Sequence, residues 1–590
     1  MNRKFFTRSI TLPVALMMSA LGATSQGADW TGDAGVDWNT ETNWTGGQVP
    51  AGQNAVITTT TGNIATISAD IVGTPVDILV GVWGNGRLDH VAGIAQTGMG
   101  NWMFIGVGGN DASGTYNLAD TATTGGTLTG FGTGSGTMNV NGNLQMGEPF
   151  AAEPGNTAVI NMNTTGALNV QWDFNVGRND ANATVNLDAG TVTAGVLNIG
   201  LDSASVGTFN QAGGSVSTTG IIHLATGATS SGTYNLTGGT VSSGGELWVG
   251  GSGTGVVNQS GGTLTTSQWF VLSRFSGANG TYNLTDGTVN AATAGGNVVI
   301  VSEGGTGVLN VSGGTFNAAS NIWVAEGYAG SGEGTLNVSG VGTVVAAGEV
   351  RLALSVGTSA TVNLDGGTLQ ADNISNGGGT GVFNFNGGTL KAGDNHDGFM
   401  NGLTRANVRD GGVVIDTNGF DVAIAQNLLH SNLIGDNETD GGLTKNGAGM
   451  LTVTGENTFT GAVTVNAGTL YAATGNGPSD QAFSYVSGIT VNSGATLRSG
   501  SNGLFGWDGT QEKAIVVNGG TLLADAGADI RVGTVTLNGG SLATLGASEG
   551  FGSWRFDDAT DRLIVTNDAT ANAVNVRFQN GAAIDVTAGK

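Results

Sequence analysis

Two short stretches of the sequence bring acidic and basic residues close enough together to suggest acid–base chemistry. They contain, in order, Asp394, His396, Asp397, Arg405, Arg409 and Asp410, and then Asp557, Asp558, Asp561 and Arg562. Hydrolases and lyases need carboxylates together with an Arg, Lys or His that moves a proton or stabilises charge. We favour the simpler interpretation, in which both stretches are solvated turn or cap residues, and we predict no catalytic residue in either.

Candidates for metal or phosphate binding are equally sparse. Asp436, Glu438 and Asp440 could hold calcium loosely, but the glycine-aspartate nonapeptide of calcium-binding β-rolls is missing. The glycine-rich stretch 250–255 lacks the lysine and the following helix of a phosphate-binding loop. We therefore predict no metal site and no cofactor.

The long middle of the chain is poor in reactive side chains. From residue 114 to residue 390 it contains no lysine, one histidine, His223, and three arginines, Arg178, Arg274 and Arg351. A polysaccharide-active enzyme is the main rival hypothesis, because many β-helical proteins are such enzymes, but fold alone does not give function. On these residues we predict that the protein is not an enzyme.

The element that must position every one of these residues is a repeat of about 24 residues. The segment Gly232–Val241 recurs almost unchanged as Gly280–Val289, and its central asparagine reappears along the chain. The recurrent asparagines are Asn117, Asn139, Asn161, Asn186, Asn210, Asn235, Asn258, Asn283, Asn310, Asn337, Asn363 and Asn384. A fixed period between about 20 and 50 residues indicates a solenoid, a propeller or another array.

The residues on either side of each asparagine predict a strand. Of these 24 flanking positions 22 are apolar, and the exceptions are Gln211 and Gln259. One face of each strand is therefore buried, while the asparagine points the opposite way. A glycine-bearing pair such as Gly238-Gly239 marks a corner after the strand, and a second apolar run such as Leu247–Val249 follows it.

This coil is too short for a propeller blade and lacks leucine-rich spacing, so we predict an all-β fold, a parallel β-helix or β-solenoid. Stacked ~4.8 Å apart, the asparagines would form a ladder of side-chain amides, which we prefer to a row of glycan or ligand contacts. Trp248, Trp269 and Trp323 lie within strand runs. They could be core residues or an exposed aromatic strip that stacks on sugar rings, and the alternation does not decide between the two.

Composition and the first residues indicate an exported protein. Residues 1–28 place three basic residues before the apolar run Ile10–Ala23 and a stretch of small residues, which is the order of a secretory signal peptide. The run is shorter than the ~20 residues of a membrane span, and no later segment predicts a transmembrane helix. The chain has no cysteine and a formal charge of −25, so we expect neither disulfides nor nucleic-acid binding.

The segments predicted along the chain are a signal peptide at 1–28, an N-terminal cap at 29–100, the solenoid array at 101–392, a joint or capping segment at 393–442, and further solenoid coils at 443–590. The cap region lacks the 24-residue rhythm, and solenoids need a terminal unit that covers their open edge. The stretch Val422–His430 is compatible with a helix, so we predict a short helix in the joint. We take Asn492, Asn518 and Asn538 as the recurrent asparagine of the resumed coils.

The stretch from residue 443 to residue 470 closely resembles the autotransporter-associated β-strand repeat. The positions that carry the resemblance are Leu443, Lys445, Gly447, Gly449, Leu451, Gly455, Asn457, Phe459, Gly461, Val465, Gly468 and Leu470. The resemblance implies a bacterial extracellular β-helical passenger in which the repeat aids export and folding. Autotransporters end in a translocator barrel, which the last residues do not resemble, so either another route exports the protein or the gene product continues beyond Lys590.

These features together predict a secreted or cell-surface, outer-membrane-associated structural protein that is adhesin-like and non-catalytic. Its expected partner is an extracellular polysaccharide or another cell-surface component. The alternatives are a polysaccharide-active β-helix enzyme and a carbohydrate-binding surface protein. Three or more converging carboxylates with an Arg or Lys in a groove would favour the enzyme, and sugar binding lost in Trp248→Ala and Trp323→Ala would favour the carbohydrate-binding protein.

Overall fold

The computed structural model describes residues 27–590 apart from 110, 125–126, 150–154, 203, 329–330, 474–481, 501–503, 506–512, 529, 547–553, 573–574 and 588–590. The predicted signal peptide therefore lies almost entirely outside the described residues. Two compact units, residues 1–195 and 196–590, divide the chain, and each is described by itself.

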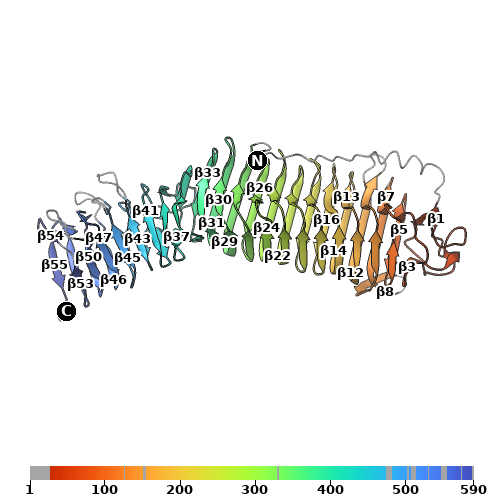
Figure 1. Cartoon of the computed structure of the whole chain (residues 1–590), viewed down its shortest axis with the longest axis horizontal. Helices are drawn as coiled ribbons and strands as arrows, with labels where there is room; N and C mark the ends of the chain where they lie inside the picture. Colours follow the sequence, from red (N-terminus) through yellow and green to blue (C-terminus); the bar gives the residue numbers. More distant parts are fainter. Residues whose placement is uncertain are drawn as a thin grey trace. The chain divides into compact units, whose positions relative to one another are not determined.

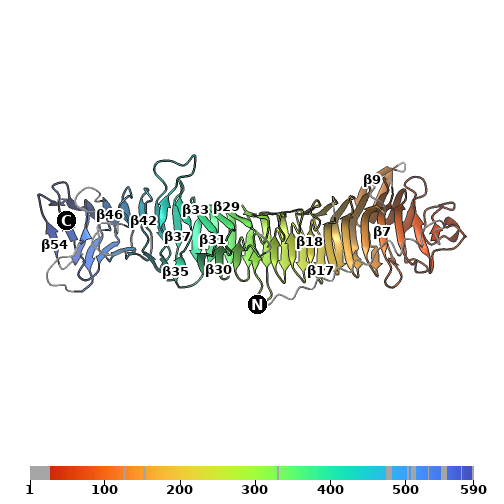
Figure 2. The same cartoon turned by 90° about the horizontal axis from the view of Figure 1, so that it is seen from above.

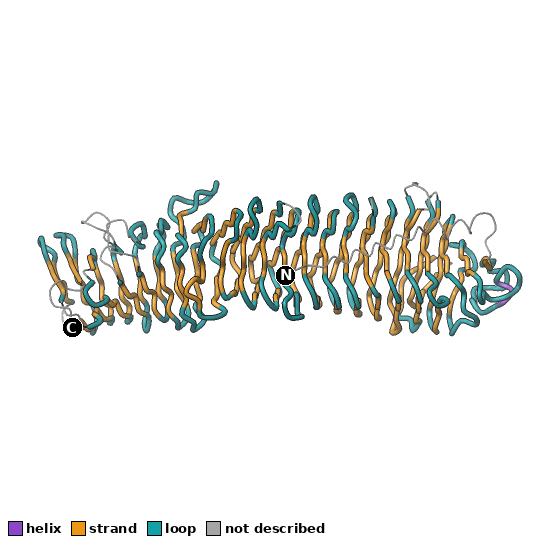
Figure 3. The backbone as a smooth tube through the Cα atoms, turned by 45° about the horizontal axis from the view of Figure 1, so that its top comes forward, coloured by secondary structure: helices purple, strands orange, loops and turns teal. Residues whose placement is uncertain are grey.

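The chain folds as an all-β parallel β-solenoid of about 20 turns with ~25 residues per turn, which confirms the predicted fold class. In each unit, strands of successive coils lie side by side in parallel (Figure 1). Strand and loop make up almost all of the described residues, and the short helical turn near the beginning of the chain is η1, Glu41–Asn43 (Figure 3). No helix in the described part of the chain is long and apolar enough to cross a membrane.

The first unit contains two parallel sheets. The strands of sheet 1 are β1 (Gly27–Asp29), β2 (Asn54–Ile57), β4 (Ile78–Val82), β7 (Met103–Gly108), β11 (Leu144–Pro149) and β13 (Asp173–Arg178). The strands of sheet 2 are β3 (Ala65–Ile67), β5 (Asn85–His90), β6 (Ile94–Gln96), β8 (Ser113–Thr124), β10 (Thr137–Val140), β12 (Thr157–Val170) and β14 (Asn182–Ala194). Strand β9 (Thr127–Gly132) folds back antiparallel on β8 and stands out from the coils (Figure 2).

The coil period reaches into the region where the sequence shows no rhythm. In register, Gly27 pairs with Asn54, Ala55 with Ile78, and Ile78 with Met103. Coils of ordinary length therefore begin at the first described residues. The sequence hides them because these coils carry other residues at the position of the recurrent asparagine.

The second unit repeats the same coil with three strand segments. Its sheet 1 holds β15 (Val196–Leu201), β18 (Ile222–Leu224), β21 (Leu247–Val249), β23 (Phe270–Leu272), β25 (Val299–Ile300), β28 (Ile322–Val324), β30 (Glu349–Leu352), β32 (Asn373–Asn376), β35 (His396–Met400), β38 (Val422–Ile424), β41 (Met450–Val453), β43 (Thr469–Ala472), β45 (Thr496–Ser499), β47 (Thr521–Ala524), β50 (Ser541–Thr544) and β53 (Thr570–Asn572). Each of these strands pairs in parallel with the next.

Sheet 2 of this unit contains two ladders that meet at the glycine corner. The first ladder runs through β16 (Val206–Gln211), β19 (Ser231–Leu236), β22 (Thr254–Thr266), β24 (Asn279–Ala291), β26 (Thr306–Val311), β29 (Glu333–Ala346), β31 (Ser359–Ala371), β33 (Thr380–Phe385), β36 (Arg405–Val408) and β39 (Leu428–His430). Strands β22, β24, β29 and β31 are long enough to belong to both ladders.

The remaining strands of the second ladder are β17 (Ser215–Thr218), β20 (Thr240–Ser243), β27 (Thr315–Ala318), β34 (Thr389–Ala392), β37 (Val413–Asp416), β40 (Leu443–Asn446), β42 (Val463–Val465), β44 (Ile489–Val491), β46 (Ile515–Asn518), β49 (Val535–Asn538), β52 (Arg562–Val565) and β55 (Ala583–Val586). A small third sheet contains β48 (Ile530–Arg531), β51 (Trp554–Phe556) and β54 (Val576–Phe578).

The residues flanking the asparagines line the interior of the coils, including the two glutamines that break the apolar pattern. Gln211 and Gln259 are each 1% exposed. Tyr234 of the following coil donates its hydroxyl hydrogen bond to Oε1 of Gln211 at 2.6 Å, and Tyr282 bonds Gln259 in the same way. The Nε2 groups donate to backbone carbonyls at the glycine corner, so both buried amides are satisfied.

The predicted helix in the joint is wrong. The stretch Val422–His430 forms the strands β38 and β39. Val422 and Ile424 point inward and pair with Leu451 and Val453 of the next coil, so burial in register outweighs the local helix-compatible spacing.

Coil length varies after this region. Asn446 and Asn466 are 20 residues apart and Asn466 and Asn492 are 26 apart, whereas Asn258 and Asn283 of β22 and β24 are 25 apart. The first ladder of sheet 2 ends at β39, and the later coils keep its second ladder together with sheet 1.

Candidate functional site

The asparagines of the first unit form a hydrogen-bonded column. Asn161 donates from Nδ2 to Oδ1 of Asn117 at 2.9 Å, and Asn186 donates to Asn161 at 2.8 Å. Asn117 in turn donates to Oδ1 of Asp89 at 2.7 Å, and Arg87 pairs with that carboxylate. The column thus begins at a carboxylate that accepts from its first amide.

The prediction that Asn139 belongs to this column is wrong. Asn139 lies on β10, in the other ladder, where it pairs with Gln96 and Asn169. Asn169 donates to its Oδ1 at 2.9 Å. One coil of 44 residues, which contains the β8–β9 hairpin, therefore separates Asn117 from Asn161, where the sequence spacing predicts two coils.

The asparagines of the second unit form a longer column with the same polarity. Each Nδ2 donates to Oδ1 of the asparagine one coil earlier, over 2.7–2.9 Å, through Asn210, Asn235, Asn258, Asn283, Asn310, Asn337, Asn363, Asn384 and Asn407. Arg405 donates from Nε to Oδ1 of Asn407 and so closes the column. Sequence reasoning missed Asn407, although it follows Asn384 by 23 residues, and also missed Asp89.

Asparagines beyond residue 440 belong to separate columns. Asn446, Asn466 and Asn492 form one column, with Nδ2 to Oδ1 distances of 2.8 and 2.7 Å, and Asn538 bonds Asn518 at 3.2 Å. These residues end strands of the second ladder or directly follow them, so the prediction that Asn492, Asn518 and Asn538 occupy the earlier position is wrong.

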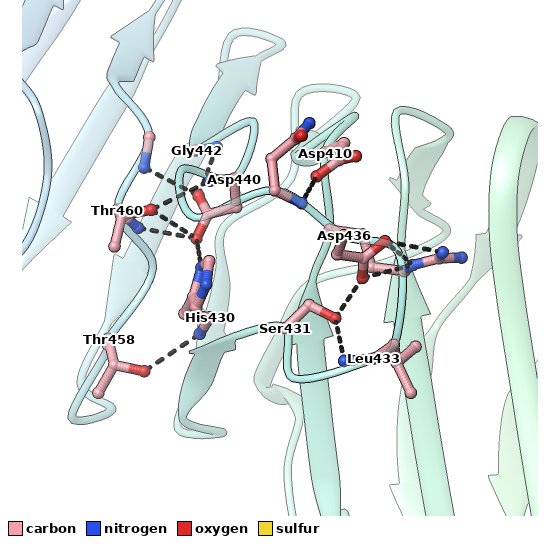
Figure 4. Close-up of polar contacts among 12 residues, drawn as sticks. Asp410, His430, Ser431, Leu433, Asp436, Asp440, Gly442, Thr458 and Thr460 are labelled. Carbon is pink, nitrogen blue, oxygen red and sulfur yellow. Dashed lines mark hydrogen bonds and ion pairs between the residues drawn. The ribbon is translucent and has the colours of Figure 1, made fainter.

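The densest polar network lies in the loop before residue 443 (Figure 4). His430 Nδ1 lies 2.8 Å from Oδ2 of Asp440, which is 4% exposed. The Asp440 carboxylate also accepts from the backbone N–H groups of Gly442 at 2.9 Å, Thr460 at 2.8 Å and Gly461 at 2.8 Å. This carboxylate therefore joins the loop to two successive coils.

A second carboxylate anchors the outer part of the same loop. Arg409 donates to Asp436 from Nε and Nη2, the latter at 2.9 Å, and the guanidinium holds the pKa of the Asp436 carboxyl below its ordinary value. Ser431 also donates its hydroxyl hydrogen bond to Asp436, and Asn437 N–H donates to Asp410 at 2.9 Å.

This network does not have the geometry of a nucleophile with its base. A serine nucleophile must donate to the histidine that activates it, but the Ser431 hydroxyl donates to Asp436 while His430 bonds Asp440. The carboxylates weighed for calcium have different partners, and Glu438 is exposed. Among the described residues no group of three or more His, Cys, Asp or Glu side chains could hold a metal ion.

The residues of the first acid–base stretch are distributed among separate turns. Asp394 accepts from the backbone of Asn395 at 2.7 Å, and His396 Nδ1 accepts from Gly398 N–H at 3.0 Å. These residues lie at sheet 1, whereas Arg405 and Arg409 lie on and after β36 of sheet 2. No interaction joins Asp397 to them among the contacts of the described residues.

The second acid–base stretch is a capped turn. The Asp561 carboxylate accepts from the backbone N–H groups of Asp557 and Asp558, both at 2.8 Å. Asp557 also bonds Arg555, and Arg562 donates to the carbonyl of Asp561 at 2.8 Å. The acidic groups here hold the backbone.

Lys445 is buried inside the solenoid, at 0% exposure. Its Nζ lies 3.1 Å from Oγ1 of Thr417, 2.9 and 2.7 Å from the carbonyls of Asn446 and Gly447, and 3.1 Å from the carbonyl of Ala467. Burial lowers the pKa of Lys445 to about 8. The ammonium thus ties three consecutive coils together at one corner.

The other positions of the resembled repeat build the same coil. Leu443, Leu451, Phe459, Val465 and Leu470 are buried. The glycines stand where a side chain does not fit. A Cβ on Gly449 would lie 1.8 Å from the carbonyl oxygen of Phe420, one on Gly461 2.2 Å from the backbone N of Gly442, and one on Gly455 2.6 Å from the carbonyl oxygen of Gln426. Gly447 and Gly468 have positive φ, of 81° and 63°. Asn457, 3% exposed, accepts from Leu428 N–H at 2.9 Å.

The parallel β-solenoid fits an autotransporter-passenger-like repeat protein, as the sequence resemblance predicts. Residues 443–472 match the family model described as Passenger-associated-transport-repeat. No curated protein and no solved structure matches the chain.

Proposed function

We propose that the protein is exported to the cell surface as a passenger-like solenoid whose role is structural or adhesive rather than catalytic. The observation that carries this proposal is the match to the passenger-associated transport repeat at residues 443–472. The repeat is an integral coil, clamped by Lys445 to the coils before and after it. A transport role and a folding role are therefore physically linked in one element.

The polar side chains support a structural role in a second way. The carboxylates of Asp440, Asp436 and Asp561 accept hydrogen bonds from backbone N–H groups or from arginine. A general acid or base needs a proton-transfer geometry toward a substrate, and these groups are instead committed to turns. These three carboxylates therefore do not support the rival hypothesis of a polysaccharide-active enzyme, which needs carboxylates that converge on a substrate.

Deletion of single coils in register tests the proposed role of the repeat. Leu443 pairs with Val463, so deletion of residues 443–462 removes one coil and rejoins equivalent positions. Thr254 pairs with Asn279, so deletion of residues 254–278 removes an ordinary coil in the same way and serves as the control. Both variants keep the predicted signal peptide at residues 1–28 and carry a C-terminal epitope tag.

Surface protein is measured on intact cells by antibody labelling and by protease shaving. We expect deletion 443–462 to lower the surface-exposed fraction at least fivefold and deletion 254–278 to leave it near the full-length value. Equal surface levels for both deletions would refute the transport role of the repeat. Retention of the full-length chain inside the cell would refute export itself.

A further inference from the structure

We propose that one outward face of sheet 1 in the second unit binds a neutral polysaccharide chain. The site, here called the aromatic patch, consists of Trp248, Trp269 and Trp323, the outward Val271 and Ile300 between them, and a polar rim of His223, Arg274, Glu303 and Arg351. It adds a ligand to the surface role proposed above and relies on that role only for its access to glycans outside the cell.

The patch gathers residue types that are rare in this part of the chain. From residue 196 to residue 390 the sequence has three tryptophans, two arginines and one histidine. All six lie on this patch, although they are spread over some 130 residues of sequence. Stacking of the coils brings them to one face, whereas the outward face of sheet 2 presents Asn and Thr.

Register places the centre of the patch in a single outward column. From one coil to the next, His223 pairs with Trp248, Trp248 with Val271, Val271 with Ile300, Ile300 with Trp323, and Trp323 with Arg351. Five intervals of ~4.8 Å give a length of about 24 Å from His223 to Arg351. The column is apolar in the middle and polar at both ends, so it suits an extended chain better than a single sugar.

The tryptophans cover the small apolar residues and remain partly exposed. Val271 and Ile300 are 0% exposed although they point away from the coil interior, because the indoles pack over them. Trp269 and Trp323 lie edge to face, with ring centroids 6.4 Å apart. Trp248 is enclosed by the His223 ring at 4.5 Å and by the Arg274 guanidinium at 4.8 Å. The stacking surface for a sugar ring is therefore the Trp269–Trp323 pair.

The rim provides hydrogen-bonding groups of both kinds. His223 Nδ1 donates to Oδ1 of Asn198 at 2.9 Å, which leaves Nε2 as an acceptor. Nε2 of His223, Nε of Arg274 and Nε of Arg351 have no hydrogen-bond partner among the described residues. Buried polar groups without partners cost free energy, and these three lie around one aromatic centre, where rotation of the rim side chains would bring them to the hydroxyl groups of a ligand.

Charge favours a neutral ligand over an acidic one. Arg274 is paired with Glu303, which is 1% exposed, so its positive charge is already neutralised. The whole chain carries a formal charge of −25 and would repel a polyanion. Aromatic faces with adjacent hydrogen-bonding groups, in a patch whose Arg274 is neutralised by Glu303, match the apolar faces and hydroxyl groups of a neutral polysaccharide.

The test uses the chain from residue 29 to residue 590 and a panel of neutral hexasaccharides of glucose, mannose and galactose, with a hexagalacturonate as the acidic probe. Binding is measured by isothermal titration calorimetry and on a glycan array. We expect at least one neutral hexasaccharide to bind, and Trp269→Ala and Trp323→Ala each to weaken it about tenfold or more, equivalent to about 1.4 kcal/mol. Trp172→Ala, which removes a 47% exposed tryptophan elsewhere, should leave it unchanged.

Far-UV circular dichroism spectra must match among the variants. His223→Gln keeps a polar side chain at the rim and leaves the tryptophans intact, so its glycan affinity gives a second measurement of the rim. Absence of neutral-glycan binding, preference for hexagalacturonate, or an affinity in Trp269→Ala and Trp323→Ala equal to that of the unaltered chain would overturn the proposal. The proposal would also be overturned if the chain binds no glycan but self-associates in sedimentation velocity, and Trp323→Ala abolishes that self-association. Surface display of Trp323→Ala should equal that of the unaltered chain, so failed binding is distinguishable from failed export.

Discussion

Replacement of Lys445 by methionine removes the buried ammonium that clamps three coils. Methionine keeps a long unbranched side chain but has no donor, so Thr417 Oγ1 and three backbone carbonyls each lose the hydrogen bond from the ammonium. The site cannot recruit solvent easily because Lys445 is 0% exposed. The loss should therefore appear as local instability of the coils that the clamp joins.

The magnitude follows from two opposing contributions. Three N–H groups with hydrogen bonds to a charged donor contribute about 1.5–3 kcal/mol each, or roughly 5–9 kcal/mol in total. Against this, the pKa of about 8 for Lys445, compared with 10.5 for an unperturbed lysine, means that keeping the charge buried costs about 3 kcal/mol at neutral pH. The expected net loss in Lys445→Met is thus about 2–6 kcal/mol.

The pH dependence has a definite sign. Between pH 8 and pH 10.5 the unfolded chain binds a proton at Lys445 that the folded chain does not, so folding stability from this group rises with pH across that window. Below pH 8 the full cost of the buried charge is present. The stability difference between the unaltered chain and Lys445→Met should therefore grow from pH 8 to pH 10.5.

Amide hydrogen exchange measures this effect coil by coil, because a solenoid coil contacts only its neighbours. Amides of β40, β42 and β43 should exchange at least tenfold faster in Lys445→Met, while those of β22 and β24 keep their rates. Lys391→Met, which removes a half-exposed outward lysine from β34, is the control and should change neither set. Unchanged exchange in β40 and β42 would refute the clamp, and uniform acceleration everywhere would refute its local action.

Three further substitutions test the polar framework. Asp440→Asn replaces an acceptor of three backbone N–H groups by an amide with a single acceptor oxygen, and should destabilise the loop and the coil after it by about 2–3 kcal/mol, measured by hydrogen exchange. Burial lowers the pKa of His90 to about 4, so stability falls as pH drops from 6.5 through 4; His90→Phe should reduce that slope in urea unfolding. Asn310→Leu leaves Asn283 and Asn337 each without one partner and should cost about 1–2 kcal/mol in the same assay, and an unchanged midpoint would contradict a stabilising column.

The coil itself could be predicted from the sequence because its signal is local and repeated. Apolar residues on both sides of an asparagine, a glycine pair and a second apolar run recur often enough to identify a solenoid. Register is less local. Met138 and Val140 flank Asn139 with the same pattern as the true column, but the hairpin β8–β9 shifts that stretch to the other ladder. A pattern of period two cannot tell one ladder of a coil from another.

The polar framework could not be predicted because it depends on side chains that break the usual burial rules. Lysine and aspartate are rarely buried, so the sequence gives no reason to place Lys445 or Asp440 inside the fold. Both are stabilised by backbone groups at corners, whose directions follow from the stacking of coils, so that the partners are 20 to 22 residues apart in sequence. The same holds for the aromatic patch, where six residues from five coils share one face only after the register is set.

Each asparagine column has a chemical direction, because every amide donates to the amide one coil earlier. Asp89 presents an acceptor below the first amide of the column in the first unit, and Arg405 presents a donor above the last amide of the column in the second unit. Both termini lie inside the solenoid, because Asp89 pairs in register with Thr66 and Asn407 with Leu429 of the neighbouring coils. The charged groups therefore complete each column at the coil where the asparagines stop, and an apolar substitution at Asp89 or Arg405 would leave the outermost amide without that partner inside the protein.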